Sequence, residues 1–90
     1  MIMGWSERTM WGGEFVPIAD LLKEGEHRIE AWGNSREGWF PYLVTPHDGI
    51  GCQIGPYFCR DQGDTLRDLK QAAARAYDID ASAVKLGRNW

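Results

Sequence analysis

The sequence predicts an α+β fold: a small antiparallel sheet of three to five strands, with one short and one longer helix packed on one face. Apolar residues recur at helical spacing through residues 65–77. Apolar and polar residues alternate through residues 27–32, and a second strand-like run follows at 39–45 after a polar turn. Consecutive strands joined by turns, with helices set apart from them, are typical of α+β domains.

The N-terminal part is predicted to contain two short edge strands and a short helix. Residues 1–3 and 14–16 form the strands, around a glycine-rich turn. Pro17 suits the first position of the helix, where its missing N–H loses no partner, and Gly25 supplies the left-handed residue that ends it. The apolar face of this helix consists of Ile18, Leu21 and Leu22.

The middle of the chain is predicted to supply three strands. Alternation divides the first strand, residues 27–32, into an apolar and a polar face, and Trp32 lies on the polar face with Arg28 and Glu30. The second strand covers residues 39–45, and a turn at 46–49 leads into the third, residues 52–59. Gly55-Pro56 marks a bulge or a sheet edge in the third strand.

The longest predicted helix covers residues 65–77. Asp64 can cap it by accepting a hydrogen bond from a free N–H of the first turn. Residues 83–86 form a last short strand, or Asp80 caps a final helical turn instead. The predicted apolar stripe of the helix is Leu66, Leu69, Ala73 and Ala76, and its outer side is Arg67, Gln71, Ala74 and Arg75.

Composition limits the class of protein. The 90 residues, 43% hydrophobic and 26% charged, suit a single domain spanning residues 1–90. No apolar run approaches the roughly 20 residues of a membrane span, and the N-terminus lacks the basic and apolar regions of a signal peptide. We therefore expect a cytoplasmic protein without a membrane partner. The formal charge of −3 argues against a general binder of phosphate backbones.

Residues that carry catalytic or metal-binding chemistry are few. Cys52, Cys59 and His47 match no structural zinc spacing. Without an export signal, the two cysteines are expected to be reduced, partly buried thiols. A nucleophile pair of Cys52 and His47 needs a third residue to orient it, and the sequence offers none. We therefore predict no catalytic residue, no metal and no cofactor, and His27 is expected to be an ordinary strand residue.

Tryptophan is over-represented, with five in 90 residues, and so short a chain cannot bury all of them. At least two are expected to be substantially exposed. Arg36 and Glu37 lie in the turn between Trp32 and Trp39, and aromatic residues with an arginine at the rim are typical of binding hot spots. The sequence thus predicts a partner-binding surface formed by Trp32, Arg36, Glu37 and Trp39. The alternative is that the two tryptophans pair across strands for stability alone.

A second candidate surface is basic. Its residues are Arg60, Arg67, Gln71 and Arg75, with Lys70 beside them. Three of them recur every fourth residue on the outer side of the long helix. Such a stripe is either a solvated face or an electrostatic contact with RNA, DNA or an acidic partner, and Asp68 on the same helix weakens its potential.

Parts of the chain resemble known families. The aromatic-proline strand at residues 40–44 and the Gly-Asp-Thr-Leu helix start at 63–66 resemble the HicB antitoxins, which have a partial RNase H fold. The helix–strand–strand–strand–helix order is similar to a double-stranded-RNA-binding domain, although residues 66–68 do not supply the lysine pair with which that family contacts phosphates. The run from Thr65 to Gly87 follows the helix-then-strand pattern of ubiquitin-like folds.

These patterns favour a non-enzymatic protein-binding module. In size, acidity and tryptophan content the chain is similar to anti-CRISPR proteins, the phage or mobile-element inhibitors of host defence. The expected mechanism is steric: an aromatic and charged patch covers a functional surface of a larger host complex. The alternative is a small RNA- or DNA-contacting regulator, as the resemblance to HicB antitoxins or double-stranded-RNA-binding domains implies.

Overall fold

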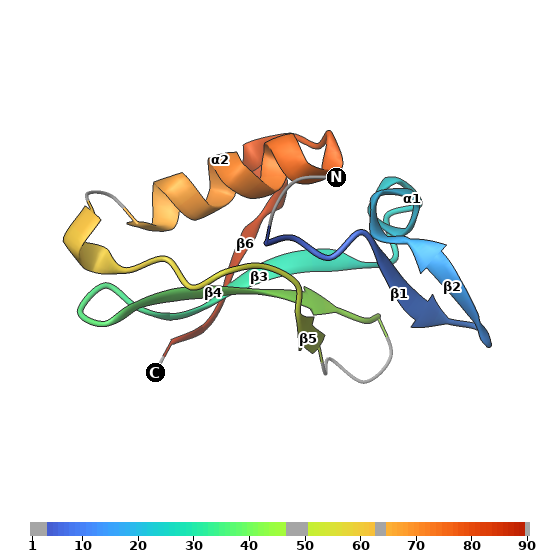
Figure 1. Ribbon diagram of the computed structural model, residues 1–90, viewed down its shortest axis with the longest axis horizontal. Coiled ribbons are helices and arrows are strands. Elements are labelled where there is room, and N and C mark those ends of the chain that lie inside the picture. Colours follow the sequence, from blue (N-terminus) through green and yellow to red (C-terminus); the bar gives the residue numbers. More distant parts are fainter. Residues whose placement is uncertain (1–3, 47–50, 63–64, 90) are drawn as a thin grey trace.

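The computed structural model describes residues 4–46, 51–62 and 65–89 (Figure 1). None of the described helices is long and apolar enough to cross a membrane. The elements in chain order are β1 (Arg8–Trp11), β2 (Glu14–Pro17), α1 (Ile18–Lys23), β3 (Arg28–Asn34), β4 (Gly38–Val44), β5 (Gly51–Gln53), η1 (Arg60–Gln62), α2 (Thr65–Tyr77), η2 (Ala81–Ala83) and β6 (Lys85–Asn89), where η1 and η2 are short 3-10 helices.

Four strands of the described chain form the main sheet, in the order β5-β4-β3-β6. β3 and β4 make an antiparallel hairpin, and β5 pairs antiparallel with β4. β6 runs parallel to β3, because α2 carries the chain back across the sheet before β6 begins (Figure 1). The predicted α+β class is confirmed. The sheet is mixed rather than antiparallel throughout, since a crossover helix joins strands that run in the same direction.

Both α-helices lie on the same side of the main sheet, and α2 packs on it (Figure 1). The bounds predicted for α2 are confirmed, and the predicted cap, Asp64, lies outside the described residues. Its buried residues are Thr65, Leu69, Ala73 and Tyr77. Leu66 and Ala76, which the sequence places in the stripe, pack only partly against the core. The buried stripe is thus rotated towards Tyr77, whose ring is buried while its hydroxyl donates to the carbonyl oxygen of Ser6.

The N-terminal hairpin pairs β1 with β2 through Gly12-Gly13, both of which have positive φ angles. The strand predicted at 14–16 is present, but its partner is β1, and the strand predicted at 1–3 lies outside the described residues. α1 begins one residue after Pro17 and ends before Gly25, whose φ of +80° is the left-handed conformation that the sequence predicts there.

The third central strand is shorter than the predicted residues 52–59. β5 covers only Gly51–Gln53, and the chain returns to the sheet at a single bridge between Phe58 and Trp39. Pro56 lies in the gap and has no N–H to donate, so a regular ladder cannot continue through it. Residues 47–49 of the predicted turn lie outside the described residues.

Both alternatives for the C-terminal segment occur, one after the other. Asp80 caps η2 by accepting a hydrogen bond from the backbone N–H of Ser82 at 2.9 Å. This bond, with a second one from the Ser82 hydroxyl, lowers the pKa of the Asp80 carboxyl. The chain then extends into β6, which overlaps the predicted strand at 83–86 and continues beyond it.

Tryptophan burial differs from the expectation. Trp5 and Trp39 are core residues, 7% and 5% exposed, whereas Trp11 and Trp32 are half-buried. Among the described tryptophans, the prediction of at least two substantially exposed side chains is therefore wrong, because Trp11 and Trp32 each cover part of their surface with another ring. Among the described residues, the exposed large apolar side chains are Met10, Phe15, Tyr57 and Leu86.

Candidate binding face

The face of the main sheet opposite the two helices carries a row of aromatic side chains. Alternation along β3 and β4 sends every second residue to this outer face. In the hairpin register Trp32 lies opposite Phe40, and Glu30 lies opposite Tyr42. Both α-helices lie on the other side of the main sheet (Figure 1). We name this set the aromatic face, and its rings are Trp32, Phe40, Tyr42 and Tyr57.

Trp32 makes contacts on the aromatic face with a neighbouring ring, a carboxylate and a guanidinium. Its ring stacks on Tyr42 with centroids 4.2 Å apart and planes 21° from parallel. Its indole N–H donates to the Glu30 carboxylate at 2.9 Å, and the same carboxylate pairs with Arg28 at 2.6 Å. On the edge strand, the guanidinium of Arg88 lies 5.2 Å from the centre of the Trp32 ring. The indole is therefore oriented before any partner arrives.

The strand β6 accommodates Trp32 only because residue 87 is a glycine. A Cβ atom built on Gly87 would overlap the Trp32 indole and the Glu30 carboxylate. The indole thus lies against bare backbone of β6, and it also stacks on Tyr42 and lies near the guanidinium of Arg88. Close backbone approach of this kind explains a glycine inside a strand.

A second ring pair extends the aromatic face towards the hairpin tip. Phe40 and Tyr57 have ring centroids 4.7 Å apart, and Tyr57 is 45% exposed. Tyr57 comes from the segment that follows β5, so chain segments distant in sequence build this surface. A surface of this composition, rich in tryptophan, tyrosine and arginine, is suited to binding a protein surface.

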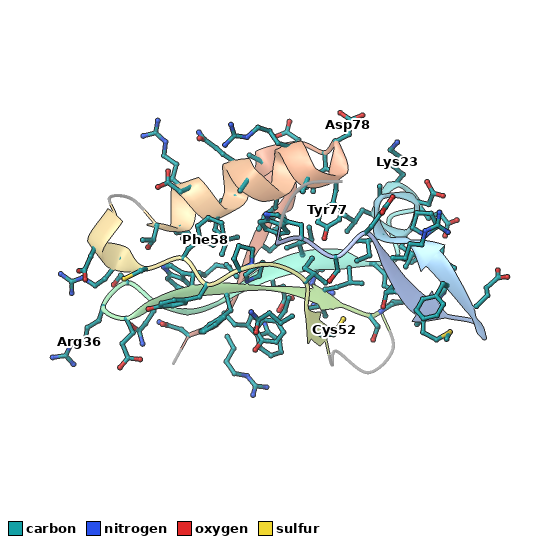
Figure 2. The ribbon with its side chains drawn as sticks, viewed as in Figure 1. Lys23, Arg36, Cys52, Phe58, Tyr77 and Asp78 are labelled. Atoms are coloured by element: carbon teal, nitrogen blue, oxygen red, sulfur yellow. The ribbon has the colours of Figure 1, made fainter. Side chains whose placement is uncertain are left out.

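The predicted site residues Arg36 and Glu37 lie between β3 and β4 and are both exposed. Figure 2 shows Arg36 at the tip of this hairpin. The backbone N–H groups of Arg36 and Glu37 donate to the Asn34 side-chain oxygen at 2.9 and 2.6 Å, which fixes the turn. Arg60, predicted for the second surface, donates instead to the carbonyl oxygen of Arg36 at 3.2 Å. Arg60 therefore lies beside the hairpin tip and lines neither cavity found along α2.

Trp39, the fourth residue predicted for the partner surface, lies on the helix side of the sheet and not on the aromatic face. It pairs with Gly33 rather than with Trp32, so its side chain points to the helix side of β4. There it is buried in the core that α2 covers. Trp32 and Trp39 consequently share neither a patch nor a cross-strand pair, which overturns both the predicted joint surface and its alternative.

The sequence prediction missed three rings of the aromatic face and the arginine that lies close to Trp32. Phe40 and Tyr42 could have been predicted from the sequence, because both alternate with Trp39 along one strand and pair with the polar side of β3. Tyr57 and Arg88 could not have been predicted in this way. Tyr57 follows an irregular segment, and the position of Arg88 depends on the parallel pairing of β6 with β3.

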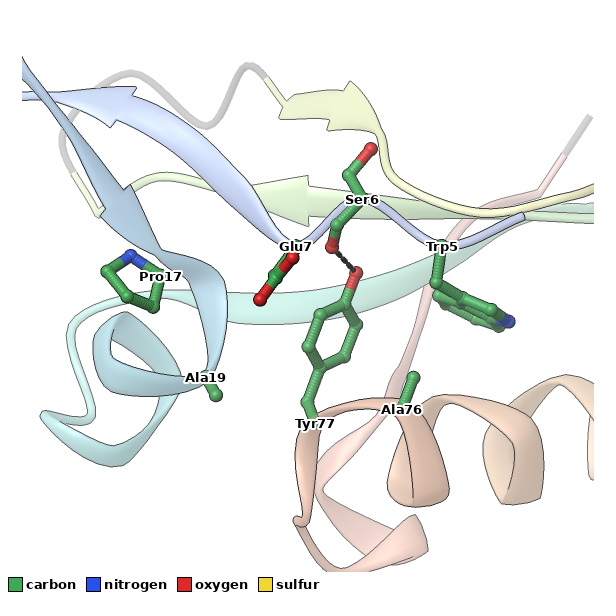
Figure 3. Close-up of a pocket in the computed structure, with 7 residues that line it drawn as sticks. All are labelled: Trp5, Ser6, Glu7, Pro17, Ala19, Ala76 and Tyr77. Atoms are coloured by element: carbon green, nitrogen blue, oxygen red, sulfur yellow. Dashed lines mark hydrogen bonds between the residues drawn. The ribbon is translucent and has the colours of Figure 1, made fainter. Parts of the chain in front are cut away.

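A cavity lies away from the aromatic face, between the N-terminal segment and the helices (Figure 3). It measures about 280 Å³ and is bounded by the segment before β1, by α1 and by the end of α2. The hydroxyl of Tyr77 on its wall already donates to Ser6 at 2.6 Å, and burial raises the pKa of Tyr77 far above its usual range. Glu7 is the charged residue of the lining. The cavity therefore contains a neutral Tyr77 hydroxyl that is already hydrogen-bonded.

The structure describes both cysteines and one of the two histidines. Cys52 and Cys59 are free, and Cys59 is half-buried, whereas Cys52 is exposed rather than partly buried as expected. No cluster of three histidine, cysteine or acidic side chains is present among the described residues. His47 lies outside them.

His27 is a buried histidine whose two ring nitrogens have no hydrogen-bond partner among the described residues. It lies just before β3 and is 4% exposed, and Trp11 packs edge-on against its ring at 4.4 Å. Burial lowers the pKa of His27, and the nearby carboxylates of Glu26 and Glu24 offset only part of this effect. The neutral imidazole is therefore the form that the fold accepts.

The domain is expected to lose stability as the pH falls below about 6.5, the value of an unperturbed histidine. Because the folded pKa of His27 is lowered, the unfolded chain binds the proton first, and the free energy of unfolding decreases until the pH passes the folded pKa. Urea unfolding at a series of pH values between 7.5 and 5 measures this slope. His27→Phe should flatten it, and an unchanged slope in that variant would contradict the assignment to His27.

Comparison with known protein families, with curated proteins and with solved structures finds no match to this chain. The geometry of the residues alone therefore supports the functional proposals below.

Proposed function

We propose that this protein is a non-enzymatic binding module that contacts a partner protein through its aromatic face. The observation that carries the proposal is the ordered stack of Arg88, Trp32 and Tyr42 on the sheet face opposite the two helices. Tryptophan, tyrosine and arginine are the residues that dominate binding energy at protein interfaces. A pre-ordered ring also loses little conformational entropy on binding.

The arrangement favours a protein partner over stacking of nucleic-acid bases. The Trp32 ring already stacks on Tyr42, and Arg88 and the backbone of Gly87 also lie close to it. A base that stacks on the indole would compete with these contacts. The edges of the rings and the polar atoms of Glu30 and Arg28 suit the mixed contacts of a protein surface instead.

For the biological role we propose steric inhibition of a larger host complex, as expected for a phage or mobile-element inhibitor of the anti-CRISPR type. A small domain that presents one aromatic face and needs no reactive group can act by covering a functional surface of its target. The support for this role is the size and character of the chain together with the aromatic face. The second candidate, an RNA- or DNA-contacting regulator, requires a phosphate contact that salt would weaken steeply.

Trp32→Ala is expected to weaken partner binding by about thirtyfold, which corresponds to about 2 kcal/mol for a buried tryptophan anchor. The partner is first captured from nuclease-treated lysate of the host cell with the wild-type protein and identified by mass spectrometry. Its affinity for the wild type and the variant is then measured by calorimetry. The melting temperature of the variant should fall by no more than about 8 °C, since Trp32 is only half-buried.

Two further variants sharpen this test. Gly87→Ala keeps the indole but pushes it from its place, so it should also weaken binding. Phe15→Ala removes an apolar side chain that is 66% exposed on the separate β1–β2 hairpin, and it should leave binding unchanged. Equal loss in Phe15→Ala and Trp32→Ala would contradict the aromatic face as the site. Loss of wild-type binding between 50 and 200 mM salt would point to the nucleic-acid candidate.

A further inference from the structure

The cavity between the N-terminal segment, α1 and the end of α2 is separate from the aromatic face, and the proposed function makes no use of it (Figure 3). We name it the Tyr77 cavity. Its volume of about 280 Å³ is far above the roughly 10–15 Å³ that one water molecule requires. A small organic group can therefore enter it.

Most of the wall of the Tyr77 cavity is apolar. Pro17 and Ala19 contribute from the start of α1, and Ala76 contributes from the last turn of α2. Trp5 and Tyr77 are 7% and 4% exposed, and their rings pack edge to face with centroids 5.8 Å apart. Such a ring pair inside the core makes this part of the wall rigid. A ligand that fits the cavity thus has an apolar body.

The polar groups of the wall differ in whether they already have a partner. The Tyr77 hydroxyl donates to the carbonyl oxygen of Ser6, and the Ser6 side chain points away from Tyr77 (Figure 3). Glu7 is the charged residue of the described lining, and its side chain makes no hydrogen bond or ion pair among the described residues. Figure 3 shows its carboxylate between Pro17 and the Tyr77 ring. Glu7 therefore provides an unpaired negative charge at the cavity.

The end of α2 adds negative potential to that of the carboxylate. Ala76 and Tyr77 belong to the last turn of the helix, where the carbonyl groups have no partner within the helix and the macrodipole is negative. The start of the short helix α1 also borders the cavity, but the N–H of Ile18 already donates to the Glu7 carbonyl oxygen at 2.9 Å. The described lining includes no lysine or arginine. The cavity therefore favours a positively charged group.

We propose that the Tyr77 cavity binds a primary alkylammonium group, with the ammonium at the Glu7 carboxylate and the alkyl chain against Pro17, Ala19 and Tyr77. An ammonium is a compact cation with three N–H donors, which suit a carboxylate beside the carbonyl end of a helix. The side chain of lysine is a butylammonium group. The same chemistry therefore comes either from a free alkylamine or from a lysine of a partner protein.

The probe for this site is n-butylammonium chloride, added at constant ionic strength to the isotope-labelled full chain and followed by amide NMR spectra. The signals of Glu7 and Tyr77 should shift and saturate with a Kd of about 1–10 mM, which a ligand of this size can reach. The neutral probe of the same length, n-butanol, should bind at least about threefold more weakly, because it lacks the charge that Glu7 attracts.

Two variants of the cavity and one control test the assignment. Glu7→Gln keeps the shape of an exposed side chain and removes its charge, so it should weaken n-butylammonium binding at least about threefold. The matched control is Glu14→Gln, an exposed glutamate of β2 outside the lining, which should leave the affinity unchanged. Ala76→Leu fills the cavity and should abolish binding of both probes. Circular dichroism verifies that each variant is folded.

The peptide N-acetyl-Gly-Gly-Lys-Gly-Gly-amide distinguishes the two sources of the ligand. Tighter binding than n-butylammonium assigns the cavity to a lysine of a partner protein, and equal or weaker binding assigns it to a free alkylamine.

Three results would overturn the proposal. The first is that no signal of a cavity residue shifts at n-butylammonium concentrations above the expected Kd, and the second is that n-butanol binds as tightly as n-butylammonium. The third is an equal loss of affinity in Glu7→Gln and Glu14→Gln. Trp32→Ala should leave n-butylammonium binding unchanged, so failure of the cavity and failure of the proposed function remain separable.

Discussion

Leu69→Ala is expected to destabilise the domain by about 2–5 kcal/mol, the largest class of effect for removal of a core leucine. Leu69 is 0% exposed and lies at the centre of the α2 stripe, so the truncated side chain leaves a cavity that the sheet below cannot fill. Small domains have only about 5–15 kcal/mol of stability, and the variant can therefore lose much of its folded population at 37 °C.

Chemical denaturation followed by circular dichroism measures this loss. Leu86→Ala is the matched control, because Leu86 is 57% exposed on the edge strand β6 and the same substitution there should change stability by less than about 0.5 kcal/mol. Equal effects at Leu69 and Leu86 would mean that the buried face of α2 is assigned to the wrong residues.

Trp39→Ala is expected to destabilise the domain by about 3–5 kcal/mol. The Trp39 side chain is 5% exposed on the helix side of the sheet, and the strand bonds of residue 39 join β4 to Phe58 at 2.9 and 3.0 Å. Removal of the indole opens a large void among Trp5, Phe58 and the residues of α2 in the same core.

The informative comparison is Trp32→Ala, the same substitution on the opposite face of the sheet. Trp32 is half-buried and packs against Tyr42 and Arg88, so its loss should cost about 1 kcal/mol, within the usual range for aromatic pairs and cation–π contacts. The midpoints of urea unfolding of the two variants show which tryptophan contributes more to the stability of the domain. A Trp32→Ala protein that is less stable than Trp39→Ala would reverse the assignment of core and binding face.

The sequence by itself determined the elements whose signal is local. The helix at 65–77 follows from its 3.6-residue apolar period, the two faces of β3 follow from strict alternation, and the end of α1 follows from a glycine. These features depend on the residues within one segment, so no other part of the chain can change them easily. The exposed outer side of α2, with Arg67 and Arg75, follows from the same periodicity.

Only the tertiary structure decided which aromatic residues share a face. The pairing of Trp32 with Phe40 rather than Trp39 is set by the length and geometry of the β3–β4 turn, and a shift of one residue would send every side chain to the other face. Arg88 reaches Trp32 because α2 returns the chain so that β6 lies parallel to β3, with Gly87 leaving space for the indole. Register and strand order arise from contacts between distant segments, which local sequence patterns do not specify.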